Sequence, residues 1–286
     1  MLQKIKLFLE LGKIRITFAV TLSTITGYIL MKQGVDWQSI LPTLGVFFLA
    51  ASSAALNQFQ ERQHDSEMDR TKNRPIPSGY VTHSEALIFI IGLALAGSAM
   101  IYFSSNLTAM LLGWLTFFWY NAVYTPLKRK TVFAVIVGAL IGALPPMIGY
   151  AAAGGHWLNM EILIVAFFFF IWQVPHFILL VLRFGSDYEK AGYPSLTERF
   201  TAYQIKRIIF IWIIGTVFSA FLMLVFHVVE NQILSYLLLL FSLSLIVTSG
   251  PLLRKDPVSF KFRKVFMNIN IYLLIIMIIL VIESVV

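Results

Sequence analysis

The chain has 286 residues, of which 58% are hydrophobic and 13% are charged, and its mean hydropathy is +0.81. This composition excludes an ordinary soluble globular domain, and the absence of cysteine excludes disulfides, thiolate nucleophiles and cysteine-ligated metals. The net charge of +8 comes without the clustered basic face of a nucleic-acid-binding fold, so no nucleic-acid partner is expected. The composition is that of an integral membrane protein.

Nine stretches are apolar enough to cross a bilayer, which takes about 20 mostly apolar residues per helix. In chain order they are residues 16–32, 40–57, 84–103, 107–124, 131–153, 159–181, 207–228, 232–250 and 265–284. No soluble segment or long linker separates them. We therefore predict an all-α, polytopic membrane protein in which residues 1–286 form a single membrane-embedded domain.

Lysine and arginine are distributed unevenly between the loops that join these stretches. All but one of the 22 basic residues fall in the N-terminus and in the second, fourth, sixth and eighth loops, and Lys32 is the exception. Cytoplasmic loops collect Lys and Arg. The pattern predicts a protein of the bacterial cytoplasmic membrane with its N-terminus inside and its C-terminus outside.

A polar run follows the second predicted span and contains regularly spaced, oxygen-bearing side chains. They are Asn57, Glu61, Asp65 and Asp69, at successive four-residue steps. On an α-helix each step returns to nearly the same face, about 6 Å further along the axis. No proline or glycine interrupts the run before Pro75. We expect the second membrane helix to continue through it and to present all four side chains on one face.

This acidic run suits a divalent cation. Carboxylates four residues apart repel one another on a helix, and oxygen ligands without cysteine suit Mg²⁺, which proteins often share with substrate phosphates. Arg70, Lys72 and Arg74 follow directly and suit the same phosphates. This continuation favours a metal and diphosphate site over the alternative, a solvated helix with ion pairs such as Asp65 with Arg62.

Two further charged clusters follow in the fourth and sixth loops. Their candidate residues are Tyr124, Lys128 and Arg129 in the first, and Arg183, Asp187, Tyr188 and Lys190 in the second. Taken alone, the first is better explained as a topogenic positive loop and the second as an ordinary charged loop. All three clusters lie on the same predicted membrane face, and the opposite face has none. We therefore expect one site that binds an amphiphile with a diphosphate head and an apolar tail.

His176 lies inside the sixth predicted span, after Trp172, Gln173 and Pro175. Ionisable residues within a membrane span are candidates for function. Spacing alone supports equally a side chain that lines a substrate cavity and one that satisfies a helix carbonyl.

Together these residues resemble the UbiA superfamily of intramembrane prenyltransferases, and within it the protoheme IX farnesyltransferases, or heme O synthases. The likeness spans roughly residues 50–200. Its pieces are the acidic motif from Asn57 to Pro75, the segment from Tyr124 to Thr131, GALPPMIGYAA from Gly142, WQVPHF from Trp172 and DYEKAGYP from Asp187. As a set, in this order, they are specific to that group.

The resemblance implies nine helices around a central, lipid-open cavity, with Mg²⁺ and farnesyl diphosphate at its cytoplasmic mouth. It also implies the reaction: loss of diphosphate gives an allylic carbocation, the vinyl group of haem B attacks it, and water completes the side chain of heme O. The expected partners are therefore farnesyl diphosphate, haem B and membrane lipid, with a haem-modifying or oxidase-assembly protein alongside.

On the matching positions, the resemblance assigns metal and diphosphate binding to Asn57, Glu61, Asp65 and Asp69, and phosphate contacts to Arg70, Arg74, Lys128 and Arg129. Our full prediction adds Asp187 as a metal ligand and takes Asp65, Asp69, Lys128 and Arg129 as catalytic. It adds Tyr124, His176, Arg183, Tyr188 and Lys190 as substrate-binding residues.

The sequence departs from the broad superfamily pattern at two positions. Glu61 stands where Asp is usual, and Asp187 has Arg183 and Ala191 four residues away on either side instead of a second Asp. The second departure puts a second, equally coordinated Mg²⁺ in doubt.

Two alternatives stay open on the sequence. One is a prenyltransferase of the same superfamily that acts on a quinone precursor or another aromatic ring. The other is a secondary transporter, which the proline-interrupted spans and intramembrane polar groups would also fit.

Overall fold

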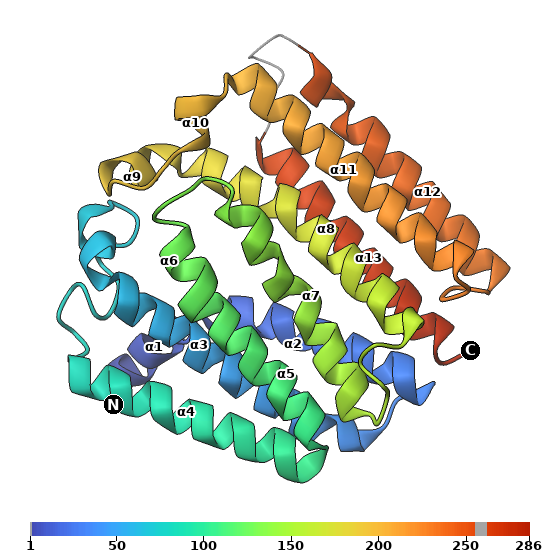
Figure 1. Cartoon of the computed structure of the whole chain (residues 1–286), viewed down its shortest axis with the longest axis horizontal. Helices are drawn as coiled ribbons and strands as arrows, with labels where there is room; N and C mark the ends of the chain where they lie inside the picture. Colours follow the sequence, from blue (N-terminus) through green and yellow to red (C-terminus); the bar gives the residue numbers. More distant parts are fainter. Residues whose placement is uncertain (1, 255–261) are drawn as a thin grey trace.

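The computed structural model describes residues 2–254 and 262–286, and in these ranges it contains helices and loops but no strand (Figure 1). The elements are α1 (Leu2–Leu11), α2 (Ile14–Lys32), η1 (Trp37–Ser39), α3 (Ile40–Glu67), α4 (His83–Ser104), α5 (Leu107–Phe118), η2 (Trp119–Tyr124), α6 (Thr125–Leu127), α7 (Ala134–Ala152), α8 (Met160–Arg183), α9 (Gly185–Lys190), α10 (Leu196–Arg199), α11 (Ala202–Val225), α12 (Gln232–Ser249), η3 (Gly250–Leu253) and α13 (Phe262–Glu283). The all-α prediction is confirmed.

Eight helices in the described ranges are long and apolar enough to cross a membrane. They occupy eight of the nine predicted spans. The remaining span, residues 107–124, is divided between α5 and the π-helical segment η2, and the short helix α6 follows it. A π-helical segment widens the helix by one residue per turn and commonly marks a functional site. The prediction of a polytopic membrane protein is confirmed, whereas the exact count of nine is not.

The helices pack side by side, and neighbours in space are often distant in sequence (Figure 1). Helix α3 packs on α4, α2 on α7, α7 on α8, and α8 on α11, while α13 contacts both α2 and α8. Helices α9 and α10 and the segment that joins α3 to α4 lie together at one end of the bundle. Met68 from that segment packs there in a buried cluster with Ala191 and Tyr193.

Helices α2 and α7 approach so closely that glycine is needed on both. A Cβ atom on Gly149 would overlap the carbonyl oxygen of Thr24, and one on Gly27 would overlap that of Pro146. Small residues at such positions let backbones pack closely, which is the main source of association between membrane helices.

We expect the Gly149→Ala variant to lower the free energy of unfolding by about 3 kcal/mol, because the overlap with the Thr24 backbone forces the two helices apart. The matched control is Gly92→Ala on α4, where a Cβ meets no atom within 4 Å. Denaturant unfolding in detergent micelles checks this. Equal stability of the two variants would show that the α2–α7 contact is not tight.

Candidate active site

A cavity of about 730 Å³ lies between helices α2, α3, α5, α7, α8 and α13. Most of its wall is apolar, with side chains such as Val46, Ile148 and Phe169. Polar and charged side chains gather at one end, which we call the mouth. The mouth is formed by the start of α2, the end of α3 with the segment after it, α6 and the loop around α9. An apolar chamber with a charged opening fits an amphiphile.

Helix α3 carries the predicted acidic run to the mouth. It is unbroken from Ile40 to Glu67 and buries Asn57, Glu61 and Asp65 on one face. The prediction that the membrane helix continues into the polar run is confirmed. Each of these three residues is less than 5% exposed, and all three line the cavity.

The expectation that Asp69 shares this helical face is wrong. The helix ends at Glu67, and Met68 has an extended backbone with ψ of 129°. The chain turns there because Met68 buries its side chain against the α9 region, and the Thr71 hydroxyl donates to the carbonyl of Asp65 at 2.9 Å. The Asp69 side chain is consequently 61% exposed.

Each buried carboxylate at the mouth already has basic partners. Lys128 Nζ lies 2.6 Å from Glu61 Oε2, and the Tyr193 hydroxyl donates to Glu61 Oε1 at 2.9 Å. Arg74 Nη1 lies 2.7 Å from Asp65 Oδ2. A buried carboxylate without a partner would be strongly destabilising, so these contacts allow the acidic stripe to exist in the ligand-free protein.

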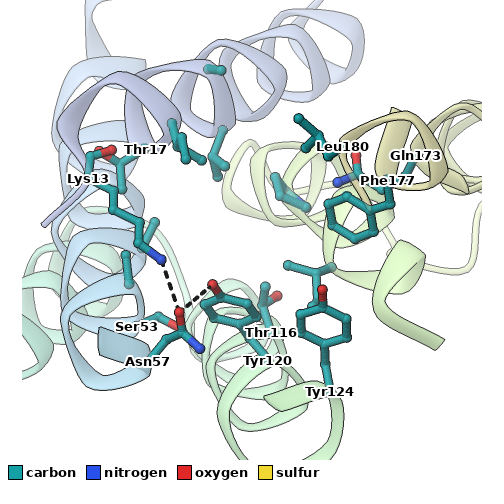
Figure 2. A pocket seen from close by; sticks show the side chains of 18 of the residues that line it. Lys13, Thr17, Ser53, Asn57, Thr116, Tyr120, Tyr124, Gln173, Phe177 and Leu180 are labelled. Carbon is teal, nitrogen blue, oxygen red and sulfur yellow. Dashed lines mark hydrogen bonds between the residues drawn. The ribbon is translucent and has the colours of Figure 1, made fainter. Parts of the chain in front are cut away.

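Asn57 makes four side-chain hydrogen bonds at the mouth, and Figure 2 draws those with Lys13 and Tyr120. Its Oδ1 accepts from Lys13 Nζ at 3.0 Å and from the Tyr120 hydroxyl at 3.1 Å. Its Nδ2 donates to Glu61 Oε2 at 3.1 Å and to Thr125 Oγ1 at 3.0 Å. With both donors and the acceptor oxygen in use, the orientation of this amide is fixed.

Lys13 was not predicted as a site residue, because it was counted only as one of the basic residues before the first span. It lies between α1 and α2 with a left-handed φ of 48°, and its side chain reaches into the cavity (Figure 2). Burial, followed by the nearby charges of Arg74 and Lys128, lowers the pKa of Lys13 to about 7. Three basic side chains, Lys13, Arg74 and Lys128, therefore surround the acidic stripe.

The outer rim of the mouth is held by a second group of contacts. Asp69 lies 2.9 Å from Lys72 Nζ and 2.7 Å from Lys190 Nζ. Hydrogen bonds from Lys190 and Lys72 lower the pKa of Asp69 to about 2. Inside this rim, burial and the adjacent Glu61 carboxylate raise the pKa of Tyr193, which keeps the hydroxyl a donor. Tyr193 lies within the DYEKAGYP segment but was not predicted as a site residue.

The other predicted residues divide into two groups. The cavity wall includes Arg70, Arg74, Tyr124, Lys128, His176 and Tyr188. Arg129, Arg183, Asp187 and Lys190 are not among the residues that line it. Arg129 donates to the carbonyl of Gln60 at 3.0 Å, and the Arg183 guanidinium lies over the rings of Phe184 and Phe262 at 5.2 and 5.4 Å. Asp187 lies in the first turn of α9.

The described residues contain no group of three or more His, Cys, Asp or Glu side chains placed to hold a metal by themselves. The oxygens present still fit Mg²⁺, which commonly binds through one or two carboxylates and completes its shell with water and substrate phosphates. Glu61, Asp65 and the Asn57 amide would supply such ligands, and the basic side chains beside them would meet the phosphates.

An aromatic row leads from the mouth into the cavity. Tyr120 and Tyr124 stack at 5.8 Å, and Tyr124 and Phe177 stack at 5.9 Å, with nearly parallel rings. The π-helical segment η2 places both tyrosines on this side, and Gly138 leaves room for the Tyr124 ring. Aromatic faces stabilise cations and exclude water.

The sequence matches the model of the UbiA prenyltransferase family over residues 20–272. The protoheme IX farnesyltransferase of Solibacter usitatus is 37% identical over 200 residues, which cover 66% of this chain and 68% of the relative. That of Oleidesulfovibrio alaskensis is 30% identical over 277 residues, which cover 97% of this chain and 96% of the relative. A structure of a UbiA homolog from Archaeoglobus fulgidus, bound to GPP and Mg²⁺, has a TM-score of 0.71 at 17% identity and covers 97% of this chain and 98% of that chain.

The Archaeoglobus structure supports the fold, and the family match covers most of the sequence. The transporter alternative is therefore not supported, and the predicted resemblance is confirmed. The chain is an integral membrane enzyme that belongs to the UbiA prenyltransferase family.

Proposed function

We propose that this protein transfers the farnesyl group of farnesyl diphosphate to the vinyl group of protoheme IX, making heme O and releasing diphosphate in a Mg²⁺-dependent reaction. The observation that carries the proposal is the buried Asn57–Glu61–Asp65 stripe facing Lys13, Arg74 and Lys128 at the mouth of an apolar cavity. The acceptor is supported by the names of the relatives that match most of this chain.

The mouth binds the diphosphate. Mg²⁺ would neutralise charge on the leaving diphosphate when held by Glu61, Asp65 and the amide of Asn57. In the ligand-free protein Lys128 and Arg74 contact the carboxylates of Glu61 and Asp65. When the substrate binds, its phosphates become their partners instead. Lys13 adds a third basic side chain, which reaches the mouth beside Asn57 (Figure 2). Positive charge fixed where negative charge develops is usually the largest catalytic contribution.

The remaining predicted residues act around this centre. We propose that Arg70 and Tyr188, which line the mouth, contact the diphosphate, and that Asp69, Lys190, Arg129, Arg183 and Asp187 organise the loops that close over it. The prenyl tail occupies the apolar chamber, and Tyr120, Tyr124 and Phe177 shield the allylic carbocation from water. With one stripe of carboxylates at the mouth, we propose a single tightly held Mg²⁺.

The same proposal places the protein in the bacterial cytoplasmic membrane, with the N-terminus and the mouth in the cytoplasm and the C-terminus outside. Farnesyl diphosphate reaches the mouth from the cytoplasm, while haem B enters from the lipid. A haem-modifying or oxidase-assembly protein would take the product.

Binding of Mg²⁺ and of the prenyl diphosphate is expected to be cooperative. Mg²⁺ alone must displace Lys128 and Arg74 from the carboxylates, whereas the diphosphate offers these cations new partners. We expect the Kd for Mg²⁺ to fall about tenfold when the thiodiphosphate analogue of farnesyl diphosphate is bound, and the Kd of the analogue to fall by the same factor with Mg²⁺.

Calorimetric titration of the detergent-solubilised protein measures both constants, after subtraction of Mg²⁺ binding to the analogue alone. The Lys72→Ala variant is the control, because Lys72 makes an exposed ion pair at the rim and is expected to leave the coupling unchanged. Independent binding of the two ligands would contradict the exchange of partners.

The acceptor is tested with purified protein, Mg²⁺ and farnesyl diphosphate, supplied with either haem B or 4-hydroxybenzoate. We expect a farnesylated haem in the first reaction and no farnesylated benzoate in the second. The opposite result would assign the protein to the quinone branch of the family.

A further inference from the structure

The cavity contains a second polar group, well away from the diphosphate mouth. Gln173 and His176 on α8 and Asn270 on α13 all line the chamber. Gln173 and His176 lie ten and seven residues before Arg183, where α8 ends, which is about 15 and 10 Å along the helix. Polar side chains at such depth are costly unless they have a partner or a function.

The Gln173 amide makes no hydrogen bond to the described residues. Its oxygen rests against Gly142, where a Cβ atom would lie only 2.7 Å away, so α7 leaves room for it. Figure 2 shows Gln173 above Phe177 on the side of the cavity opposite Lys13 and Asn57. Gln173 is partly buried and lines the cavity, so its amide, which has no partner among the described residues, is free to hold a water or ligand there.

Three hydroxyl groups that line the same cavity, unlike the Gln173 amide, do have hydrogen-bond partners. Thr17 donates to the carbonyl of Ile14, Ser23 to that of Val20, and Thr116 to that of Leu112. Each is satisfied within its own helix. The Gln173 amide, which has no partner among the described residues, therefore differs from these three hydroxyls.

His176 completes the group. Its ring packs among those of Trp172, Phe266 and Phe177, with centroids 4.9, 5.0 and 6.0 Å away. The Asn270 side chain is a hydrogen-bond neighbour, whereas Nδ1 is buried without a partner among the described residues. A ring nitrogen left free while a neighbour fixes the ring is the arrangement of a proton acceptor.

We infer that Gln173 and His176 form the site that holds and deprotonates the water added to the acceptor. This rests on the proposed function. When the C1–O bond of the prenyl diphosphate breaks, its electron pair leaves with the diphosphate, and the vinyl π pair of the acceptor forms a bond to C1. The positive charge then resides on the vinyl carbon next to the ring. A water held by the Gln173 amide gives its lone pair to that carbon, and its proton passes to His176.

The water site lies deeper in the cavity than the diphosphate mouth, and a row of aromatic rings connects the two. Lys128 at the mouth lies 5.7 Å from the Tyr124 ring centroid, Tyr124 stacks on Phe177, and Phe177 is one helical turn from Gln173. The path from leaving group to water thus runs along the aromatic row. Separation of the two polar groups by apolar rings keeps the water away from the allylic cation until the new carbon–carbon bond has formed.

The test is the ratio of two products. Without an ordered water, the cation loses a proton from the neighbouring carbon and gives an alkene lighter by one water. We expect the Gln173→Met variant, which keeps length and volume, to raise the ratio of dehydrated to hydrated farnesyl haem by about tenfold or more. Release of diphosphate should stay near the wild-type rate, because the mouth is unchanged.

His176→Phe keeps a planar ring without the nitrogen and is expected to shift the ratio in the same direction. Gln173→Glu restores a hydrogen-bonding group and should return the ratio towards wild type. Thr116→Val is the matched control, since it removes a cavity hydroxyl that is already paired in its own helix, and its ratio should equal that of the wild type.

Mass spectrometry of the extracted haem gives the ratio, and gel filtration in detergent confirms that each variant is folded. If either Gln173→Met or His176→Phe does not fold, the product ratio of the other variant tests the proposal. A wild-type product ratio in the folded variants would overturn the hydration site while leaving the proposed function intact. Absence of any farnesylated haem with the wild-type protein would instead overturn the proposed function, and this inference with it.

Discussion

Replacing Asp65 with Asn is expected to lower the rate of farnesyl transfer by a factor on the order of a hundred to a thousand. The change preserves the shape of a side chain that is 1% exposed on the cavity wall. It removes one of the two buried negative charges that would hold Mg²⁺ and leaves Arg74 without its carboxylate partner. The loss should appear mainly in kcat, because the charge acts on the leaving diphosphate.

Release of diphosphate from farnesyl diphosphate, with haem B as the acceptor, measures this rate. Glu67→Gln is the matched control, since Glu67 is exposed in the last turn of the same helix and outside the cavity wall. It loses the same charge and is expected to keep its activity. Full activity of Asp65→Asn would exclude this residue from the metal and diphosphate site.

Removal of Lys128 is expected to affect stability and activity together. In Lys128→Gln, the carboxylate of Glu61 stays buried but loses its cation, and breaking a buried pair in this way typically costs 3–5 kcal/mol. The side chains of Lys128 and Glu61 are 17% and 5% exposed, so we expect a loss of about 3 kcal/mol in the free energy of unfolding. Activity should also fall at least about a hundredfold, because a phosphate ligand is lost.

The double variant Glu61→Gln with Lys128→Gln separates the two effects. It removes both charges, so most of the lost stability should return, whereas activity should stay low. Denaturant unfolding in detergent and the diphosphate assay measure the two quantities on the same samples. Recovery of activity together with stability would show that this ion pair serves only the fold.

Much of the architecture follows from local features of the sequence. The spans are apolar stretches, and the extension of α3 into the polar run follows from the lack of Pro and Gly before Pro75. Spacing therefore placed Asn57, Glu61 and Asp65 correctly on one face. Asp69 broke the pattern because a tertiary contact ends the helix: Met68 packs against Tyr193, more than a hundred residues away, and no local spacing reports that.

The same limit explains the residues that were missed. Lys13 reaches Asn57 across 44 positions and Tyr193 reaches Glu61 across 132. Tyr193 lies within the DYEKAGYP segment, but no local spacing connects either residue to the acidic run. Residues 107–124 were predicted as one uniform span, whereas the structure divides them at Trp119. The π-helical turn there depends on packing against α3 and α7. Apolarity alone, which located the span, contains no signal for it.

The central claim is that this UbiA family enzyme farnesylates haem, and the haem pool of cells tests it most directly. Cells that lack their own heme O synthase would express either the wild-type chain or Asp65→Asn, and extracted haem would be analysed by mass spectrometry. We predict a haem heavier than haem B by one farnesyl group and one hydroxyl group with the wild-type chain, and haem B alone with the variant. An unmodified haem pool with abundant, folded wild-type protein would contradict the account.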